Sequence, residues 1–591
     1  MGEPSTVTTP AERSSEKRLD SWKEIAAYLK RDVTTVQRWE KREAMPVHRH
    51  VHDKRGSVYA LSSELDAWLL GRKSGLDLEE AEESLLAQED RGVSQTPRAR
   101  KWLVLGGVAV VLTLLAGAYI VNRNRHTVGP RPKIQSLAVL PLKNLSGDPT
   151  QEYFAEGMTE AIIGRLSMIR GLRVISRTSV MRFRDTRASV PEIAKTLGVD
   201  AVVEGSVIRE GDHLRVHAQL IRGASDDHFW SETYDREIGD VLVLESEVAQ
   251  AIAEKVEVTI SGEERARLVA ARPVSPEVYE SFLKGEFTQN YDRADVAKAI
   301  AYFEDAIKKD PKFAPAYLGL ADAYEQFGTA GIGGAAPGEV RPKAISAIHK
   351  ALELDPNLSQ AHTQLANAYR LEWKWSDSEA EYKRALELNP NDAGAHLGYA
   401  GWLICEGRAD EALVWARRAR ELDPLGVTGG NSMGWILFIT RHYDEAIREL
   451  KSDLAVHPDD GSTYWFLGFA LIANAQAQEA IPVLEKAVAL SDRSPAVIAV
   501  LIRVYAHAGR RAQALGLLAE LQRRQKQGYV TPAAFVNAYL GLGDNEKALA
   551  ALEQAYQDQS AILQFVRVHP FMDPVRNDPR FADLVRRVGL N

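Results

Sequence analysis

The sequence predicts a multidomain chain with a small winged helix-turn-helix, one transmembrane helix, an α/β domain and an all-α superhelix of repeats. Three observations predict this fold class. Residues 102–121 are twenty consecutive residues without a charge. A basic segment at 18–73, with sequence patterns typical of helices and strands, precedes this run. Regularly spaced prolines occur in the C-terminal half of the chain, from Pro356 to Pro458. At 591 residues the chain is long enough for two to four domains.

Composition excludes several classes of function. The net charge of −8 names no partner, and the only cysteine is Cys405. One cysteine permits neither an intramolecular disulfide nor a clustered-cysteine metal site. The sequence also has no Walker lysine motif, no H-E-x-x-H and no dinucleotide fingerprint. We therefore expect no enzyme, no catalytic residues, no cofactor and no metal.

Residues 18–73 carry 12 Lys and Arg against 8 Asp and Glu, a local net charge of +4. Ser21 and Glu24 form a capping-box signature that predicts a first helix. A short break at 30–33 precedes a second helix, in which Val36 and Trp39 would face the first. Short polar residues followed by basic ones on a second helix are typical of a major-groove reader. The DNA-facing residues of this helix would be Thr34, Thr35, Gln37, Arg38, Lys41 and Arg42.

Two short strands at 46–51 and 57–60 enclose a basic turn and indicate a wing. Side chains of a wing bind phosphates, which position a protein without carrying sequence information. A third helix at 64–70 would close the core with Leu65, Trp68 and Leu69. The wing would present Arg49, His50, Lys54 and Arg55 to the DNA backbone.

The stretch SWKEIAAYLKRDVTTVQRWEKREAMPVHRHVHDKRGSVYALSSELDAWL resembles the winged helix-turn-helix of the MerR/excisionase type. The resemblance implies double-stranded DNA as a partner, with the second helix in the major groove and the wing on the backbone. The alternative is a small helical module that binds protein. Full MerR regulators continue into a dimerisation coiled coil, and this chain does not, so a homodimer would need another surface. The implied roles fall on Thr34, Thr35, Gln37 and Arg38, and on Arg49, Lys54 and Arg55.

Residues 102–121 have the length and composition of a helix that crosses a lipid bilayer. Each flank carries four basic residues, so flanking charge does not set the orientation. Residues 1–17 are expected to be a disordered N-terminus and residues 74–101 an acidic, flexible linker. Small residues recur every four positions on one face, which favours close pairing of two spans. These residues are Ala109, Thr113 and Gly117.

Residues 134–260 alternate between short apolar runs and helical periodicity, which predicts an α/β domain. The stretches LAVLPLKNLSGDPTQEYFAEGMTEAI, LRVISRTSV, LGVDAVVEGSVIREGDHLRVHAQLI and HFWSETYDR resemble the TolB amino-terminal-like domain. The resemblance implies a role in protein contact or sensing and transfers no catalytic residues. The expected strands are 136–140, 172–175, 201–208, 214–220 and 228–234, and the expected helices are 153–167, 191–197 and 241–258.

Pro356, Pro390, Pro424 and Pro458 recur at one constant spacing. That spacing equals the period of tetratricopeptide repeats, about 34 residues. Small residues where two helices cross, such as Gly434 and Gly468, agree with that signature. Residues 280–562 are thus predicted to form about eight such repeats, with an insertion around 331–338. The array would have a concave groove for a protein or peptide, although a spacer or oligomerisation arm stays open. Residues 563–591 are expected to form capping helices.

This order of parts resembles membrane-anchored one-component regulators of the ToxR/CadC kind, although the DNA-binding domain differs in type. We therefore expect a single-pass regulator in the inner membrane, with residues 1–101 cytoplasmic and residues 122–591 periplasmic. An outside partner would alter span packing or oligomerisation. The alternative is a membrane-anchored scaffold whose N-terminal domain binds protein rather than DNA.

Overall fold

The computed structural model describes residues 18–43, 45–49, 58–66, 68, 133–269, 272–288, 293–328 and 337–590. The chain divides into two compact units, residues 1–130 and 131–591. The predicted N-terminal tail, linker and span, with Ala109, Thr113 and Gly117, lie outside the described residues. Within the described ranges no helix is both long and apolar enough to cross a bilayer.

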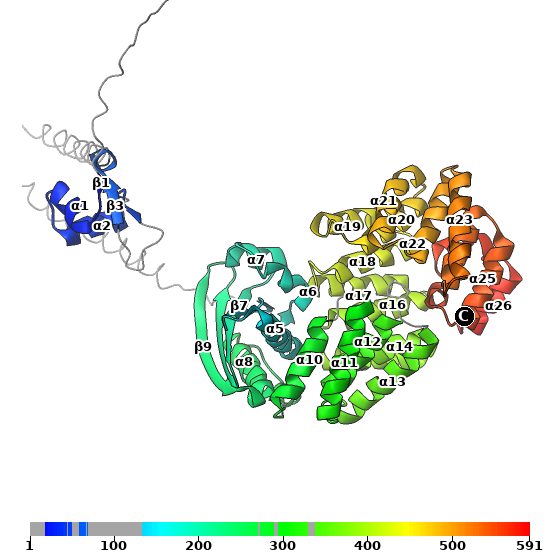
Figure 1. Ribbon diagram of the computed structural model, residues 1–591, viewed down its shortest axis with the longest axis horizontal. Coiled ribbons are helices and arrows are strands. Elements are labelled where there is room, and N and C mark those ends of the chain that lie inside the picture. Colours follow the sequence, from blue (N-terminus) through cyan, green and yellow to red (C-terminus); the bar gives the residue numbers. More distant parts are fainter. Residues whose placement is uncertain are drawn as a thin grey trace, which may run out of the picture. The chain divides into compact units, whose positions relative to one another are not determined.

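Two short helices, a three-stranded sheet and a third helical stretch at 62–66 and 68 make up the described part of the N-terminal unit (Figure 1). Leu65 of this stretch is buried in the core and Trp68 packs against it, as predicted for the third helix. The central strand β3 pairs antiparallel with β1 on one side and with β2 on the other. Strand β1 was not predicted, because two residues carry no periodicity. The elements are β1 Arg18–Leu19, α1 Trp22–Tyr28, α2 Val33–Glu43, β2 His48–Arg49 and β3 Val58–Leu61.

A six-stranded mixed sheet forms the α/β domain, in the order β6-β4-β7-β8-β9, with β5 also paired to β7. Strands β6, β4 and β7 run parallel, and β7, β8 and β9 form an antiparallel meander. The hairpin of β7 and β8 turns at Gly211, whose φ of +62° favours glycine. The strands are β4 Ser136–Val139, β5 Lys143–Asn144, β6 Arg173–Val174, β7 Ala201–Glu210, β8 His213–Arg222 and β9 Asp227–Glu237.

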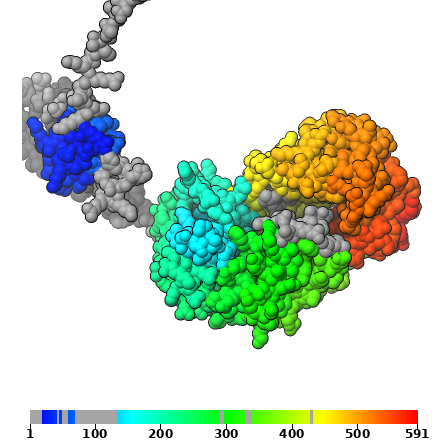
Figure 2. Space-filling view, viewed as in Figure 1, coloured from blue at the N-terminus to red at the C-terminus, as the bar shows by residue number. Residues whose placement is uncertain are grey.

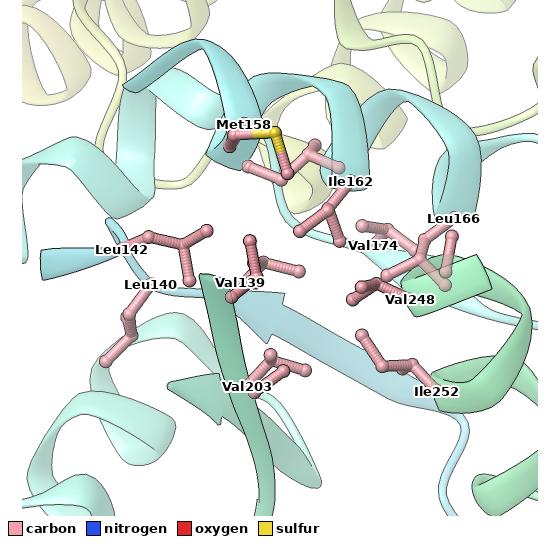
Figure 3. Packing of buried hydrophobic residues seen from close by; sticks show 14 of the residues in the cluster. Val139, Leu140, Leu142, Met158, Ile162, Leu166, Val174, Val203, Val248 and Ile252 are labelled. Atoms are coloured by element: carbon pink, nitrogen blue, oxygen red, sulfur yellow. The ribbon is translucent and has the colours of Figure 1, made fainter. Parts of the chain in front are cut away.

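Helices α5 Glu152–Ser167 and α8 Val241–Lys255 pack together over this sheet. Figure 3 shows Met158, Ile162 and Leu166 of α5 meeting the strand residue Val203 and the α8 residue Ile252. All five side chains are buried, so the sheet and both helices share one hydrophobic core. The remaining helices of the domain are α6 Arg177–Val180, α7 Val190–Leu197 and α9 Gly262–Val269.

Eight consecutive helix pairs follow between residues 276 and 557 of the described chain (Figure 1). Pro311, Pro356, Pro390, Pro424 and Pro458 each lie between two pairs. The predicted insertion falls mostly outside the described residues, just before α13. The pairs are α10 Pro276–Thr288 with α11 Arg293–Lys309, α12 Ala314–Phe327 with α13 Pro337–Leu354, α14 Ser359–Leu371 with α15 Trp375–Leu388, α16 Ala393–Cys405 with α17 Ala409–Leu422, α18 Val427–Ile439 with α19 Tyr443–Val456, α20 Gly461–Ala473 with α21 Ala477–Leu490, α22 Pro495–His507 with α23 Arg511–Gln525, and α24 Pro532–Leu542 with α25 Asn545–Gln557.

Glycines let the two helices of a pair approach closely. A Cβ added at Gly434 would lie 2.4 Å from Leu450 of the second helix, and one at Gly468 would lie 2.5 Å from Leu484. These distances leave no room for a methyl group, so the helix crossing itself requires glycine. The small residues that marked the repeat in the sequence therefore have a steric cause.

Residues 559–590, here called the C-terminal segment, return to the repeats after the last pair. In the space-filling view these red residues lie directly against the orange residues of the later repeats (Figure 2). The segment contains two 3₁₀ helices, η4 Ala561–Phe565 and η5 Pro570–Val575, and then α26 Pro579–Arg587. Only α26 corresponds to the expected capping helices.

Candidate nucleic-acid interface and repeat groove

The first two helices are joined by a tight turn that two caps define. The Ser21 hydroxyl accepts a hydrogen bond from the Glu24 backbone N–H at 3.3 Å, which begins α1. Lys30 adopts a φ of +51° after α1 and reverses the chain. The Asp32 carboxylate then begins α2 by accepting from both the backbone N–H and the hydroxyl of Thr35, at 2.8 and 2.7 Å. These two bonds hold the pKa of Asp32 below its usual range.

The second helix buries one side and leaves the opposite side open. Val36 and Trp39 are buried against Ile25 and Ala26 of α1, as the sequence predicts. Of the expected DNA-facing residues, Thr34 and Arg38 are exposed, and Thr35 and Gln37 are partly exposed. The Thr35 hydroxyl is already engaged with Asp32, so it serves the cap. Lys41 and Arg42 lie in α2, but their side chains are outside the described residues.

The structure describes only part of the predicted wing, namely its two strands. Strand β2 holds Arg49, whose side chain is not described, and His50, Lys54 and Arg55 lie outside the described residues. The His48 ring stacks on Tyr59 at 5.1 Å between centroids, and its Nε2 lies 2.7 Å from Glu64 Oε2. These contacts fix β2 on β3, so the chain leaves and re-enters the sheet at defined positions.

Three successive loops between repeats each contact the α/β domain through the residue at the same repeat position. We call this row of contacts the ladder. Asn389, Asp423 and His457 occupy the same position in successive repeats, and each immediately precedes a repeat proline. Asp423 is only 4% exposed and accepts from three hydroxyl groups of α6 and its N-cap. The α/β domain and repeats three to five therefore form one body. The bonds are Asn389 Nδ2 to Ser167 Oγ at 2.9 Å, Thr178 Oγ1 and Ser179 Oγ to Asp423 Oδ1 at 2.6 Å each, Ser176 Oγ to the same oxygen, and Arg182 Nη1 with His457 Nδ1 at 3.0 Å.

The first helices of repeats three to eight, α14, α16, α18, α20, α22 and α24, contact the C-terminal segment. Residues 561–575 reach from α14 to α24. Eleven of these fifteen residues form the two 3₁₀ helices, which span roughly 22 Å, and the other four add at most about 14 Å. Six helices packed side by side span about 45 Å. The six helices must therefore curve around the segment. We call this surface the concave face.

Aromatic side chains line the middle of the concave face and hold the segment. Trp435 lies 5.7 Å from Phe565, and Phe438 lies 5.5 Å from both His569 and Phe571, measured between ring centroids. Phe469 stacks on Phe571 at 5.1 Å. Offset and edge-to-face pairs at these separations add to the burial of apolar surface. The cluster fixes the segment to the central repeats.

His569 is uncharged in this cluster. Its side chain is 3% exposed, and its Nδ1 accepts from the Phe571 backbone N–H at 3.1 Å. Burial, and then the nearby Arg503 guanidinium, lower the pKa of His569 to about 3. Burial likewise raises the pKa of the Cys405 thiol to about 12, so this cysteine is not a nucleophile at neutral pH. Across the described ranges no group of three or more His, Cys, Asp or Glu side chains is placed to hold a metal ion.

Comparisons with known families divide the chain in the same places. Residues 133–251 match the model of the HilA/YgeH-like transcriptional regulator, second domain. Residues 290–331, 363–426 and 471–534 match tetratricopeptide-repeat models. The predicted repeats are therefore confirmed. The model that matches the α/β domain describes a regulator domain, and the resemblance to TolB stays a prediction.

Individual proteins resemble parts of the chain. A protein of Rhizobium meliloti (strain 1021) named putative adenylate cyclase 3 is 34% identical over 191 residues, which is 32% of each chain. The chain thus spans about a third of that relative's length. Among solved structures, YrrB, a TPR protein with an unusual peptide-binding site, matches 32% of this chain and 91% of its own at 19% identity and a TM-score of 0.23. The anaphase-promoting complex hetero-tetramer Cut9-Hcn1 matches 59% of this chain and 63% of its own at 16% identity and a TM-score of 0.36.

Two features of the site were not found from the sequence. Asp32, three positions before Thr35, is a helix N-cap that the spacing could have indicated. The placement of Phe565, His569 and Phe571 on the concave face left no local signal, because their partners on the repeats lie far away in the sequence.

Proposed function

We propose that this protein is a single-pass, membrane-anchored, DNA-binding transcriptional regulator whose C-terminal unit binds a protein or peptide. The match of residues 133–251 to a domain of transcriptional regulators carries the proposal. The exposed Thr34 and Arg38 on α2 support a DNA-reading role for the N-terminal unit. The tetratricopeptide repeats support a protein or peptide partner.

In this proposal the C-terminal unit moves as one body. The ladder at Asn389, Asp423 and His457 joins the repeats to the α/β domain, so a partner on the repeats would move both together. Pairing of two chains through Ala109, Thr113 and Gly117 would then bring two DNA readers to adjacent half-sites and raise their effective concentration. The similarity to the relative named as an adenylate cyclase extends over only 191 residues. We propose a binding rather than a catalytic role for this stretch.

The second candidate is a membrane-anchored tetratricopeptide-repeat scaffold, which the same repeats favour. Arg38→Ala separates the two, because this guanidinium is exposed on the proposed reading side of α2. We expect Arg38→Ala in the full chain to abolish the response of regulated promoters in a transcript comparison against the unaltered strain. Lys23→Ala, an exposed lysine of α1, is the matched control and should leave the response intact. Unchanged transcription with lost partner capture would favour the scaffold.

The proposed topology places residues 1–101 in the cytoplasm and residues 122–591 in the periplasm. The charge-free run at 102–121 motivates it, together with the need for the DNA reader to face the chromosome. A periplasm-active reporter fused after Asn591 should be active, and a cytoplasm-active one silent. The reverse pattern would refute the topology.

A further inference from the structure

Two guanidinium groups on the concave face have no carboxylate partner among the described residues. They belong to Arg370 of α14 and Arg503 of α22. Arg503 is only 4% exposed, and its Nε and Nη1 make no hydrogen bond within the described ranges. The Nε of Arg370 is also buried without a partner there. A buried arginine is normally matched by an anion, because its charge and its N–H groups both need compensation.

The hydrogen bonds from the C-terminal segment to these arginines all end on neutral oxygens, and its Asp573 carboxylate acts on Arg503 only through space. Arg370 Nη1 donates to the amide Oε1 of Gln564, and Arg503 Nη2 lies 3.5 Å from the Phe571 carbonyl oxygen. Each guanidinium also faces an aromatic ring of the segment, at 5.9 Å for Phe565 and 3.8 Å for Phe571. Rings and amide oxygens satisfy part of what a carboxylate would supply.

An ion pair at the edge of the same surface provides a contrast. Arg441, in the turn after α18, binds Asp573 of the segment through two bonds of 2.9 Å each. The segment therefore forms a bidentate carboxylate pair where it has an acid, and among the described residues it places no carboxylate within bonding distance of Arg370 or Arg503. The segment therefore matches the aromatic side chains of the concave face, but it does not match the charges of Arg370 and Arg503 with bonded carboxylates.

We propose that the concave face binds an acidic, aromatic-containing segment of a partner protein, and that residues 561–575 occupy the site as an internal substitute ligand. The partner supplies carboxylates to Arg370 and Arg503 and displaces Phe565 and Phe571 from the aromatic cluster. This inference rests on the proposed partner binding by the repeats and names the chemistry of that partner. It also implies that the chain binds the partner only as the segment leaves.

Gln564 provides the test, because a glutamate at this position puts a carboxylate opposite Arg370 with the shape almost unchanged. The full chain receives a protease site in the loop after α25, at 558–560, and is cut under native conditions, so that the segment is held without a covalent link. A fluorescent peptide of residues 559–591 then exchanges for the cut segment. Three unlabelled peptides compete with it: the natural one, Gln564→Glu and Gln564→Ala.

We expect Gln564→Glu to compete about tenfold better than the natural peptide and Gln564→Ala about tenfold worse. The gain from Gln564→Glu should disappear when the cut chain carries Arg370→Met. Asn577→Asp adds the same charge at an exposed position of the segment and should change competition less than about twofold.

Three results would overturn the proposal. In the first, Gln564→Glu competes no better than the natural peptide. In the second, the cut segment leaves only when circular dichroism shows the repeats unfolding, which would make it a structural cap. In the third, the uncut chain dimerises by exchanging segments, so the occupant is a second copy. Competition does not involve DNA, so its failure leaves the proposed DNA binding intact and separately testable.

Discussion

Replacing Phe438 by alanine is expected to destabilise the repeat array by about 3–5 kcal/mol, the cost of removing a large buried ring. Phe438 is 1% exposed and lies next to several aromatic rings. It packs on Trp435 and Phe469 of the first helices and on His569 and Phe571 of the C-terminal segment. Because it contacts both partners, the cavity would loosen the segment as well as the helices.

The measurement is the midpoint of urea unfolding of the full chain, followed by circular dichroism. Val414→Ala is the control, since Val414 is 62% exposed on the repeat array and should shift stability by less than about 0.5 kcal/mol. In the cut form of the chain, Phe438→Ala should also speed release of the segment. A stability loss below about 1 kcal/mol would mean that the aromatic cluster does not hold the segment.

Acidification from pH 7 to pH 5 is expected to cost the folded chain about 2 kcal/mol through His569. The pKa of this histidine is about 3 in the folded chain, against an ordinary value of 6.5. Between these two pH values the unfolded chain binds a proton that the folded chain does not, so stability falls as the pH falls. The charged groups around the ring are Arg503, Arg441 and Arg576, which oppose protonation, and Asp573, which favours it.

Other buried groups respond in the opposite direction. Burial raises the pKa of Glu245 and of Asp453 to about 6, so the folded chain binds protons there before the unfolded chain does. Protonation of these two carboxyl groups therefore stabilises the folded chain as the pH falls from about 6 toward their ordinary pKa values. The effect of His569 is therefore read as a difference between the unaltered chain and His569→Asn, whose amide oxygen can still accept from Phe571.

Unfolding midpoints of the two proteins at pH 7 and pH 5 give that difference. The unaltered chain should lose about 2 kcal/mol more than His569→Asn over this interval. Equal losses would show that His569 is not held in its neutral form by the segment's contacts. Because the same contacts anchor the segment, release of the cut segment should also be faster at pH 5.

The sequence predicted the repeats and the strands well because their signals are local. The glycines at Gly434 and Gly468 follow from the way two helices cross within one repeat. A proline lies between repeats at the first five junctions, from Pro311 to Pro458. Alternation in β8 predicted a strand with one buried side, and the structure has it at His213–Arg222. Val36 and Trp39 were predicted to face α1 from helical spacing alone, and both are buried there.

Long-range contacts could not be predicted in this way. The short strand β1 exists only because it pairs with β3, which follows both helices in the chain. Asn389 and Asp423 precede prolines and carry no motif in the sequence, although they hold the α/β domain through partners that are far away in the sequence. His569 read as part of a cap, since nothing near it in the sequence shows that Phe438 and Phe469 enclose it.

DNA binding by the N-terminal unit is the central claim, and a fluorescence titration of labelled duplex DNA with the full chain in detergent tests it most directly. Binding at about 50 mM salt should weaken by more than about tenfold at about 200 mM, because Lys and Arg contacts release counterions from the phosphates. Arg38→Ala should weaken binding by about 10- to 100-fold, and Lys23→Ala by less than about threefold. Absence of binding at the lower salt concentration, or equal binding by Arg38→Ala, would contradict the account.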